Sequence, residues 1–137
     1  MLRVVADPGV LIAALLSPGG APAEILEHWG EGAFDLVVSP KLLEEFGRTL
    51  SRRKFRRYAT LEEARRYVES VRERAVHADD APDAAGESPD PGDDYLIALA
   101  RTANAHVLVS GDAHLTEIEQ ARPPVLTPRQ FLDRLEA

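Results

Sequence analysis

The sequence has no cysteine, and this single absence excludes three kinds of chemistry. There can be no disulfide framework, no zinc site held by thiolates and no cysteine nucleophile, and the chain suits a reducing cytoplasm. Histidine is scarce as well, with four scattered residues in 137. If the protein binds a metal ion, we therefore expect hard oxygen ligands from carboxylates.

Long apolar runs are also missing. The first residues imitate a signal peptide, because an apolar stretch leads to Ala21-Pro22-Ala23. Asp7-Pro8-Gly9 interrupts that stretch with a carboxylate and two helix breakers, and no other segment is long enough to span a bilayer. We expect a soluble, cytoplasmic protein with no membrane association. Its length fits one domain over residues 1–137.

An excess of positive charge is the third absence. The net charge of -7 argues against a nucleic-acid-binding protein that works by bulk positive charge. The charge is unevenly distributed, however. Residues 48–74 hold ten of the sixteen Lys and Arg residues and four of the acids, so this segment carries +6 and the rest of the chain carries -13. One face or arm of the molecule should be basic and the remainder acidic.

The apolar pattern predicts strands that alternate with helices. The expected strands cover residues 2–6, 34–38, 106–109 and 124–126, with a short one near Val76. The expected helices cover residues 10–16, 23–32, 40–51, 61–74, 94–104 and a closing helix from 128. Such alternation predicts an α/β domain of three layers, α/β/α, with a mostly parallel central sheet of about five strands. Residues 78–92 contain three Pro and five acids, which predicts a mobile acidic loop.

The chain is organised around residues 88–115. Asp93 and Asp94 precede an apolar helix, and Ser110-Gly111-Asp112 follows an apolar strand. This arrangement can bring Asp94 and Asp112 together, which costs Coulomb repulsion unless a cation lies between them. The alternative is that these acids only cap helices, as acids at helix starts often do.

Two further carboxylates favour a metal site. In open α/β sheets, ligands bind outside the carboxyl ends of the strands, near the point where the strand order reverses. Asp7 and Asp112 both follow predicted strands, and Glu45 lies on a neighbouring helix. With Asp94, they make four carboxylates that could converge on one or two Mg²⁺ or Mn²⁺ ions.

The order of these motifs resembles a PIN-domain ribonuclease of the toxin class in prokaryotic toxin–antitoxin systems, similar in layout to VapC-type toxins. The resemblance covers essentially the whole chain. It rests on an Asp after the first strand with VLIAALLSPGG behind it, and on the segments VVSPKLLEEF, RRKF, DPGDDYLIALA, VLVSGD and TPRQFL.

The resemblance implies a ribonuclease that depends on Mg²⁺ or Mn²⁺, with a protein antitoxin as partner and a homodimer left open. The family's four acids correspond to Asp7, Glu45, Asp94 and Asp112. Asp7, Asp94 and Asp112 would hold metal, and Glu45 would complete the site directly or through water. Ser110 matches a family Ser or Thr that can orient a carboxylate or a metal-bound water, and Asp93 is a supporting acid.

The segment 51–57, SRRKFRR, packs five cations around one Phe. It is either the end of a helix followed by a solvated loop or a surface that contacts RNA phosphates. The cations are Arg52, Arg53, Lys54, Arg56 and Arg57.

The chain departs from the family pattern at two places. Pro8-Gly9 stands where Thr-Asn is usual, and His114 stands where a further Asp is common. The alternative function is therefore a PIN-like domain with weakened catalysis that binds RNA or a protein. A receiver-like phospho-acceptor domain is disfavoured, because the first strand ends in a lone Asp7 and no Lys follows Lys54.

Overall fold

The computed structural model describes residues 1–81 and 94–137, with the side chain of Asp94 excepted. The described residues form one parallel five-stranded sheet in the order β3-β2-β1-β4-β5. The strands are β1 (Arg3–Ala6), β2 (Asp35–Val38), β3 (Val76–His77), β4 (Val107–Val109) and β5 (Val125–Leu126). Because β2 and β3 lie on one side of β1 and β4 and β5 on the other, the strand order reverses between β1 and β4. The expected parallel sheet is confirmed.

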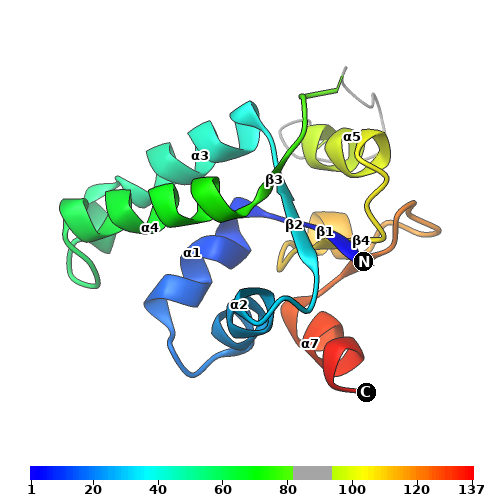
Figure 1. The fold of residues 1–137 in the computed structure, drawn as a ribbon, viewed down its shortest axis with the longest axis horizontal. Helices are drawn as coiled ribbons and strands as arrows, with labels where there is room; N and C mark the ends of the chain where they lie inside the picture. The colour runs from blue at the N-terminus through cyan, green and yellow to red at the C-terminus, as the bar shows by residue number, and fades with distance from the viewer. Residues whose placement is uncertain (82–93) are drawn as a thin grey trace.

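Seven α-helices connect and cover the described strands. They are α1 (Pro8–Leu16), α2 (Ala21–Gly30), α3 (Pro40–Leu50), α4 (Leu61–Arg74), α5 (Asp94–Thr102), α6 (Ala113–Thr116) and α7 (Pro128–Glu136), with a 3₁₀ helix, η1 (Arg53–Phe55), between α3 and α4. In Figure 1, α1, α3 and α4 lie on one side of the sheet and α5 lies on the other. This arrangement confirms the three-layer α/β/α architecture.

The three central strands form the middle of the core. Val4, Val5 and all three residues of β4 are at most 1% exposed, as expected for strands covered on both faces. Phe46 of α3 and Phe131 of α7 are fully buried on the helices. The apolar runs identified in the sequence are therefore the runs that the fold buries.

Helix starts follow local capping chemistry. The Ser39 hydroxyl accepts from Leu42 N–H at 3.2 Å, and Pro40 opens α3. Thr60 and Glu63 form the expected capping box of α4. The expected turn at Pro8-Gly9 was wrong, because α1 begins at Pro8 with Asp7 as its N-cap. Proline at the first helical position costs nothing, since its missing N–H would have no partner inside the helix.

Helix α2 begins at Ala21, two residues earlier than expected. The short helix α6 begins after Asp112, which is its N-cap, as the alternative for this acid predicted. Most of the acidic loop expected at 78–92 lies outside the described residues. In the described part, no single helix is long and apolar enough to cross a membrane; α1 and α2 reach that length only as a pair bent by 99°.

Tyr67 ties α4 to the helix that follows Asp7. Its hydroxyl donates to the carbonyl oxygen of Leu11 in α1 at 2.6 Å, and its ring packs edge-on against Phe46, with 5.6 Å between centroids. Burial raises the pKa of Tyr67 well above its usual range. The folded protein therefore keeps this phenol protonated at a pH where the unfolded chain ionises it.

We predict that Tyr67→Phe lowers the free energy of unfolding by about 1 kcal/mol at pH 7, because one hydrogen bond is lost. Above about pH 10 the unfolded wild type binds fewer protons than the folded state, so wild-type stability falls by up to about 1.4 kcal/mol per pH unit. The advantage of wild type over the variant should shrink there and vanish. Urea unfolding from pH 7 to 11 measures this, and a constant difference would contradict it. Tyr58→Phe, at a ring 57% exposed, is the control at pH 7.

Candidate active site at the carboxyl edge of the sheet

Asp7 lies directly after β1, where two structural constraints fix its position. Its backbone N–H donates to the Val109 carbonyl oxygen at 2.9 Å, which extends the pairing of β1 with β4. Its side chain caps α1, with Oδ1 accepting from Gly9 N–H at 3.0 Å. The carboxylate of Asp7 is therefore held at the carboxyl edge of the sheet, at the point where the strand order reverses.

Ser110 follows β4 and links the two acids of this edge. It is fully buried, and its N–H donates to Leu126 of β5 at 2.9 Å. Its hydroxyl donates to Asp7 Oδ2 at 2.8 Å and accepts from the Asp112 N–H at 3.0 Å. One buried hydroxyl thus orients the Asp7 carboxylate and fixes the backbone of Asp112.

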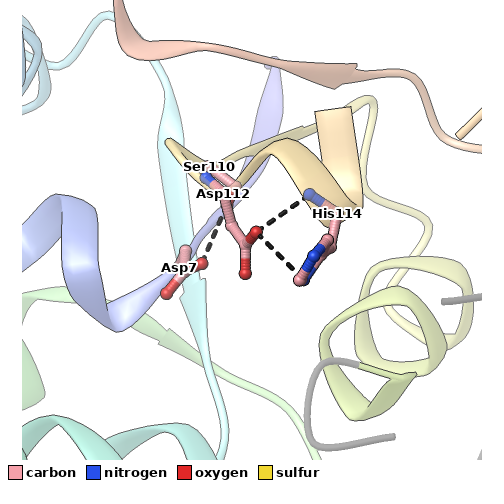
Figure 2. A network of polar contacts seen from close by, with 4 residues as sticks. All are labelled: Asp7, Ser110, Asp112 and His114. Atoms are coloured by element: carbon pink, nitrogen blue, oxygen red, sulfur yellow. Dashed lines mark hydrogen bonds and ion pairs between the residues drawn. The ribbon is translucent and has the colours of Figure 1, made fainter. Parts of the chain in front are cut away.

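Asp112 caps the short helix α6. Its Oδ1 accepts from the His114 N–H at 2.9 Å, and Nδ1 of the His114 ring lies 3.7 Å from the same oxygen. Figure 2 shows this network, with dashed lines from one carboxylate oxygen of Asp112 to the backbone and to the ring of His114. His114 contacts Asp112 through both its backbone N–H and its ring.

Asp7 and Asp112 line one cleft of about 350 Å³, which Gly9, Gly111 and Pro128 also line. Among the described residues, neither carboxylate has a Lys or Arg within ion-pair distance; the His114 ring is the nearest basic group to Asp112. Two carboxylates that line one cleft without a cation between them repel each other. Their oxygen donors fit Mg²⁺ or Mn²⁺, which prefer carboxylate and water ligands.

A complete metal-ligand group cannot be assembled from the described residues alone. No three His, Cys, Asp or Glu side chains in that part of the chain lie close enough to hold a metal ion. The side chain of Asp94, the third expected ligand, and all of Asp93 lie outside it. The backbone of Asp94 opens α5, and α5 packs against β1 and β4. Asp94 therefore belongs to a helix next to the two strands that precede Asp7 and Asp112.

Glu45 lines a second, neighbouring cavity of about 540 Å³, which we call the α3–α5 cavity. Its Oε2 accepts a hydrogen bond from the hydroxyl of Tyr95 in α5. Sequence reasoning missed Tyr95, because a hydrogen bond across 50 residues leaves no local signal. The described contacts join Asp7 to Asp112 and Glu45 to Tyr95, and they do not join the two pairs. The cavity is lined by Pro40, Lys41, Glu44, Glu45, Arg48, Asp80 and Tyr95.

The basic segment 52–57 does not overhang this edge, contrary to our expectation. It connects α3 to α4 at the end of these helices that lies far from α5 (Figure 1), and it lines neither cavity. Arg52, Arg53, Lys54 and Arg57 are exposed there. Arg56 instead turns inward: its Nη2 donates to the Leu50 carbonyl oxygen, and Nε and Nη1 are buried without a partner. Arg56 therefore satisfies the end of α3 and is not free to contact a phosphate.

We predict that Ser110→Ala lowers the free energy of unfolding by about 1–3 kcal/mol, because it leaves a partly buried N–H of Asp112 without an acceptor. Thermal or urea unfolding measures the loss. Ser110→Thr keeps the hydroxyl and should retain more stability than Ser110→Ala. Equal losses in both variants would show that the hydroxyl contributes nothing beyond its volume.

Replacing the cations of the basic segment one at a time should separate their roles. Arg56→Gln should destabilise the fold by about 1–2 kcal/mol, because the Leu50 carbonyl oxygen loses a charged donor. Arg53→Gln, the exposed neighbour, should change stability by less than about 0.5 kcal/mol. Urea unfolding of both variants measures this, and equal stability would contradict the inward placement of Arg56.

Comparisons with known proteins agree with this architecture. The family model described as PIN domain matches residues 3–114. The crystal structure of PAE2754 from Pyrobaculum aerophilum is similar over 98% of this chain and 90% of that chain, with a TM-score of 0.70 and 17% identity. The structure of VapBC2 from Rickettsia felis bound to a DNA fragment from their promoter is similar over 91% of this chain and 97% of that chain, with a TM-score of 0.63 and 14% identity. None of the curated proteins matches the sequence. The chain belongs to the PIN-domain family.

Proposed function

We propose that this PIN domain is a divalent-metal-dependent endoribonuclease and the toxin of a toxin–antitoxin pair. The family has a nuclease-type fold. The observation that carries the proposal is the pair of acids Asp7 and Asp112 where the strand order reverses: the Ser110 hydroxyl donates to the Asp7 carboxylate and accepts from the backbone N–H of Asp112. Within the described residues they lack a Lys or Arg partner, which is the electrostatic condition for a cation site.

Asp7 and Asp112 would hold Mg²⁺ or Mn²⁺ together with Asp94, and Glu45 would complete the site directly or through water. Such an ion, when bound, lowers the pKa of a water and stabilises negative charge on a phosphodiester. Ser110 keeps Oδ2 of Asp7 oriented, so that little reorganisation is needed at the reacting phosphate. The second oxygen of the same carboxylate, Oδ1, accepts a hydrogen bond from the Gly9 N–H. This backbone donor orients Asp7 although Gly9 has no side chain of the Asn type that is usual at its position.

An acidic cleft repels an RNA backbone, so cations elsewhere must supply attraction. Arg52, Arg53, Lys54 and Arg57 are the exposed group that can contact RNA phosphates or an acidic antitoxin. Because they lie at the far end of α3, we assign them to binding and not to the chemical step. The protein would act in the cytoplasm.

The purified protein should cleave a mixed RNA pool when Mg²⁺ or Mn²⁺ is added, and Asp112→Asn should lower the rate by about 100-fold or more. This size is expected because even residues that only orient metal ligands cost 10–100-fold when replaced. Asp133→Asn changes an exposed acid on α7 and should cleave like wild type. Gel analysis of the RNA measures both.

Metal binding can be followed without activity. Mn²⁺ should raise the melting temperature of wild type, with about 2.7 kcal/mol gained when its concentration is 100 times the Kd. Asp112→Asn should melt higher than wild type without metal, because repulsion is relieved, and should gain less from metal. If the protein binds RNA but does not cleave it at any concentration of either ion, the enzyme proposal is wrong and the chain is an RNA-binding module.

A further inference from the structure

Tyr95 connects the two helices that flank the carboxyl edge of the sheet. It is only 6% exposed, and its phenol oxygen reaches across from α5 to Glu45 on α3. A carboxylate can only accept, so the Tyr95 hydroxyl is the donor. The ring also lies beneath Lys41, whose Nζ is 4.8 Å from the ring centroid. Tyr95 thus contacts α3 through both its polar end and its ring.

The surroundings hold this contact in one geometry. The backbone N–H of Lys41 donates to Asp80 Oδ2 at 2.9 Å, which fixes the first turn of α3. Ser39, fully buried, caps the same helix. On the other side, Leu96 and Ile97, which follow Tyr95 in α5, are at most 4% exposed. Both ends of the hydrogen bond therefore belong to anchored helices.

Tyr95 is also next to a proposed metal ligand in the sequence. Tyr95 immediately follows Asp94, so a proposed metal ligand and the donor that holds a second acid are adjacent in the chain. A Glu side chain has several rotatable bonds, and fixing it in one rotamer costs conformational entropy. A carboxylate that is already hydrogen-bonded has this ordering in place before any ligand arrives.

We propose that Tyr95 is a positioning residue that holds the Glu45 carboxylate in place for the metal and substrate. This inference rests on the proposed function of the site. The phenol occupies one of the acceptor positions of Glu45, and a carboxylate has about four, so the remaining positions stay available to a cation or to water.

The test uses Tyr95→Phe, which keeps the ring and its burial and removes only the hydroxyl. With a defined RNA and saturating Mn²⁺, kcat should fall about tenfold with KM little changed, a range typical for residues that orient a metal ligand. The Mn²⁺ concentration that gives half of the maximal melting-temperature shift should rise severalfold. Tyr58→Phe removes the same group from an exposed ring and should change neither quantity.

A double variant shows whether Tyr95 acts through Glu45. Glu45→Gln should lower kcat more than Tyr95→Phe does, and adding Tyr95→Phe to it should cause less than a twofold further loss, because the interaction is already altered. Equal losses in both backgrounds would overturn the proposal. So would a Tyr95→Phe variant that melts lower but has wild-type kcat and wild-type Mn²⁺ dependence, since that is the result of a purely structural role.

The outcome can be separated from the fate of the nuclease itself. If wild type cleaves no RNA but is stabilised by Mn²⁺, the enzyme proposal fails and the Mn²⁺ titration still decides the role of Tyr95. If Tyr95→Phe then needs the same Mn²⁺ concentration as wild type for half of the maximal melting-temperature shift, the inference is overturned. If Mn²⁺ does not stabilise wild type, both proposals fail, because there is then no bound metal ion for which Glu45 needs to be positioned.

Discussion

The placement of β1 between β2 and β4, with all strands parallel, is the constraint on which the rest of the structure depends. The carboxyl ends of parallel strands lie at one edge of the sheet. Because the strand order reverses beside β1, the connections that follow β1 and β4 run toward opposite sides of the sheet. The connection after β1 carries Asp7, and the one after β4 carries Ser110 and Asp112. Because these strands are buried on both faces, the three residues have little freedom, and the Ser110 hydroxyl joins them in a fixed arrangement.

The features that sequence reasoning predicted are those with a local or periodic cause. Fully buried strands require short apolar runs, so residues 4–6 and 107–109 could be recognised, and their alternation with helices implied a parallel sheet. The start of α3 after Ser39 and that of α4 after Thr60 follow from capping chemistry contained within a few residues. The positions of Asp7 and Asp112 after their strands then followed from the general behaviour of such sheets.

The features that it missed depend on distant parts of the chain or on competing local signals. Pro8-Gly9 has the composition of a turn, yet the cap supplied by Asp7 allows the same residues to open α1. Arg56 belongs to a run of cations, and only the fold shows that its guanidinium turns back to Leu50. The Tyr95–Glu45 hydrogen bond joins two helices on opposite sides of the sheet edge, which no spacing in the sequence encodes. Specific side-chain contacts of this kind are set by tertiary packing.

The acids of the sheet edge and the cations of the basic segment, which are separate in the sequence, are also separate in the folded protein. The acids that follow β1 and β4 lie at one edge of the sheet, whereas the exposed cations of the basic segment lie at the far end of α3, whose 11 residues span about 16 Å. Cations placed beside the cleft would neutralise Asp7 and Asp112 and compete with a metal ion for them. Keeping them at a distance leaves the carboxylates available to a divalent ion while still offering an attractive surface to a polyanion. On the proposed function, attraction of RNA and its cleavage are therefore separable properties of this chain, carried by different residues.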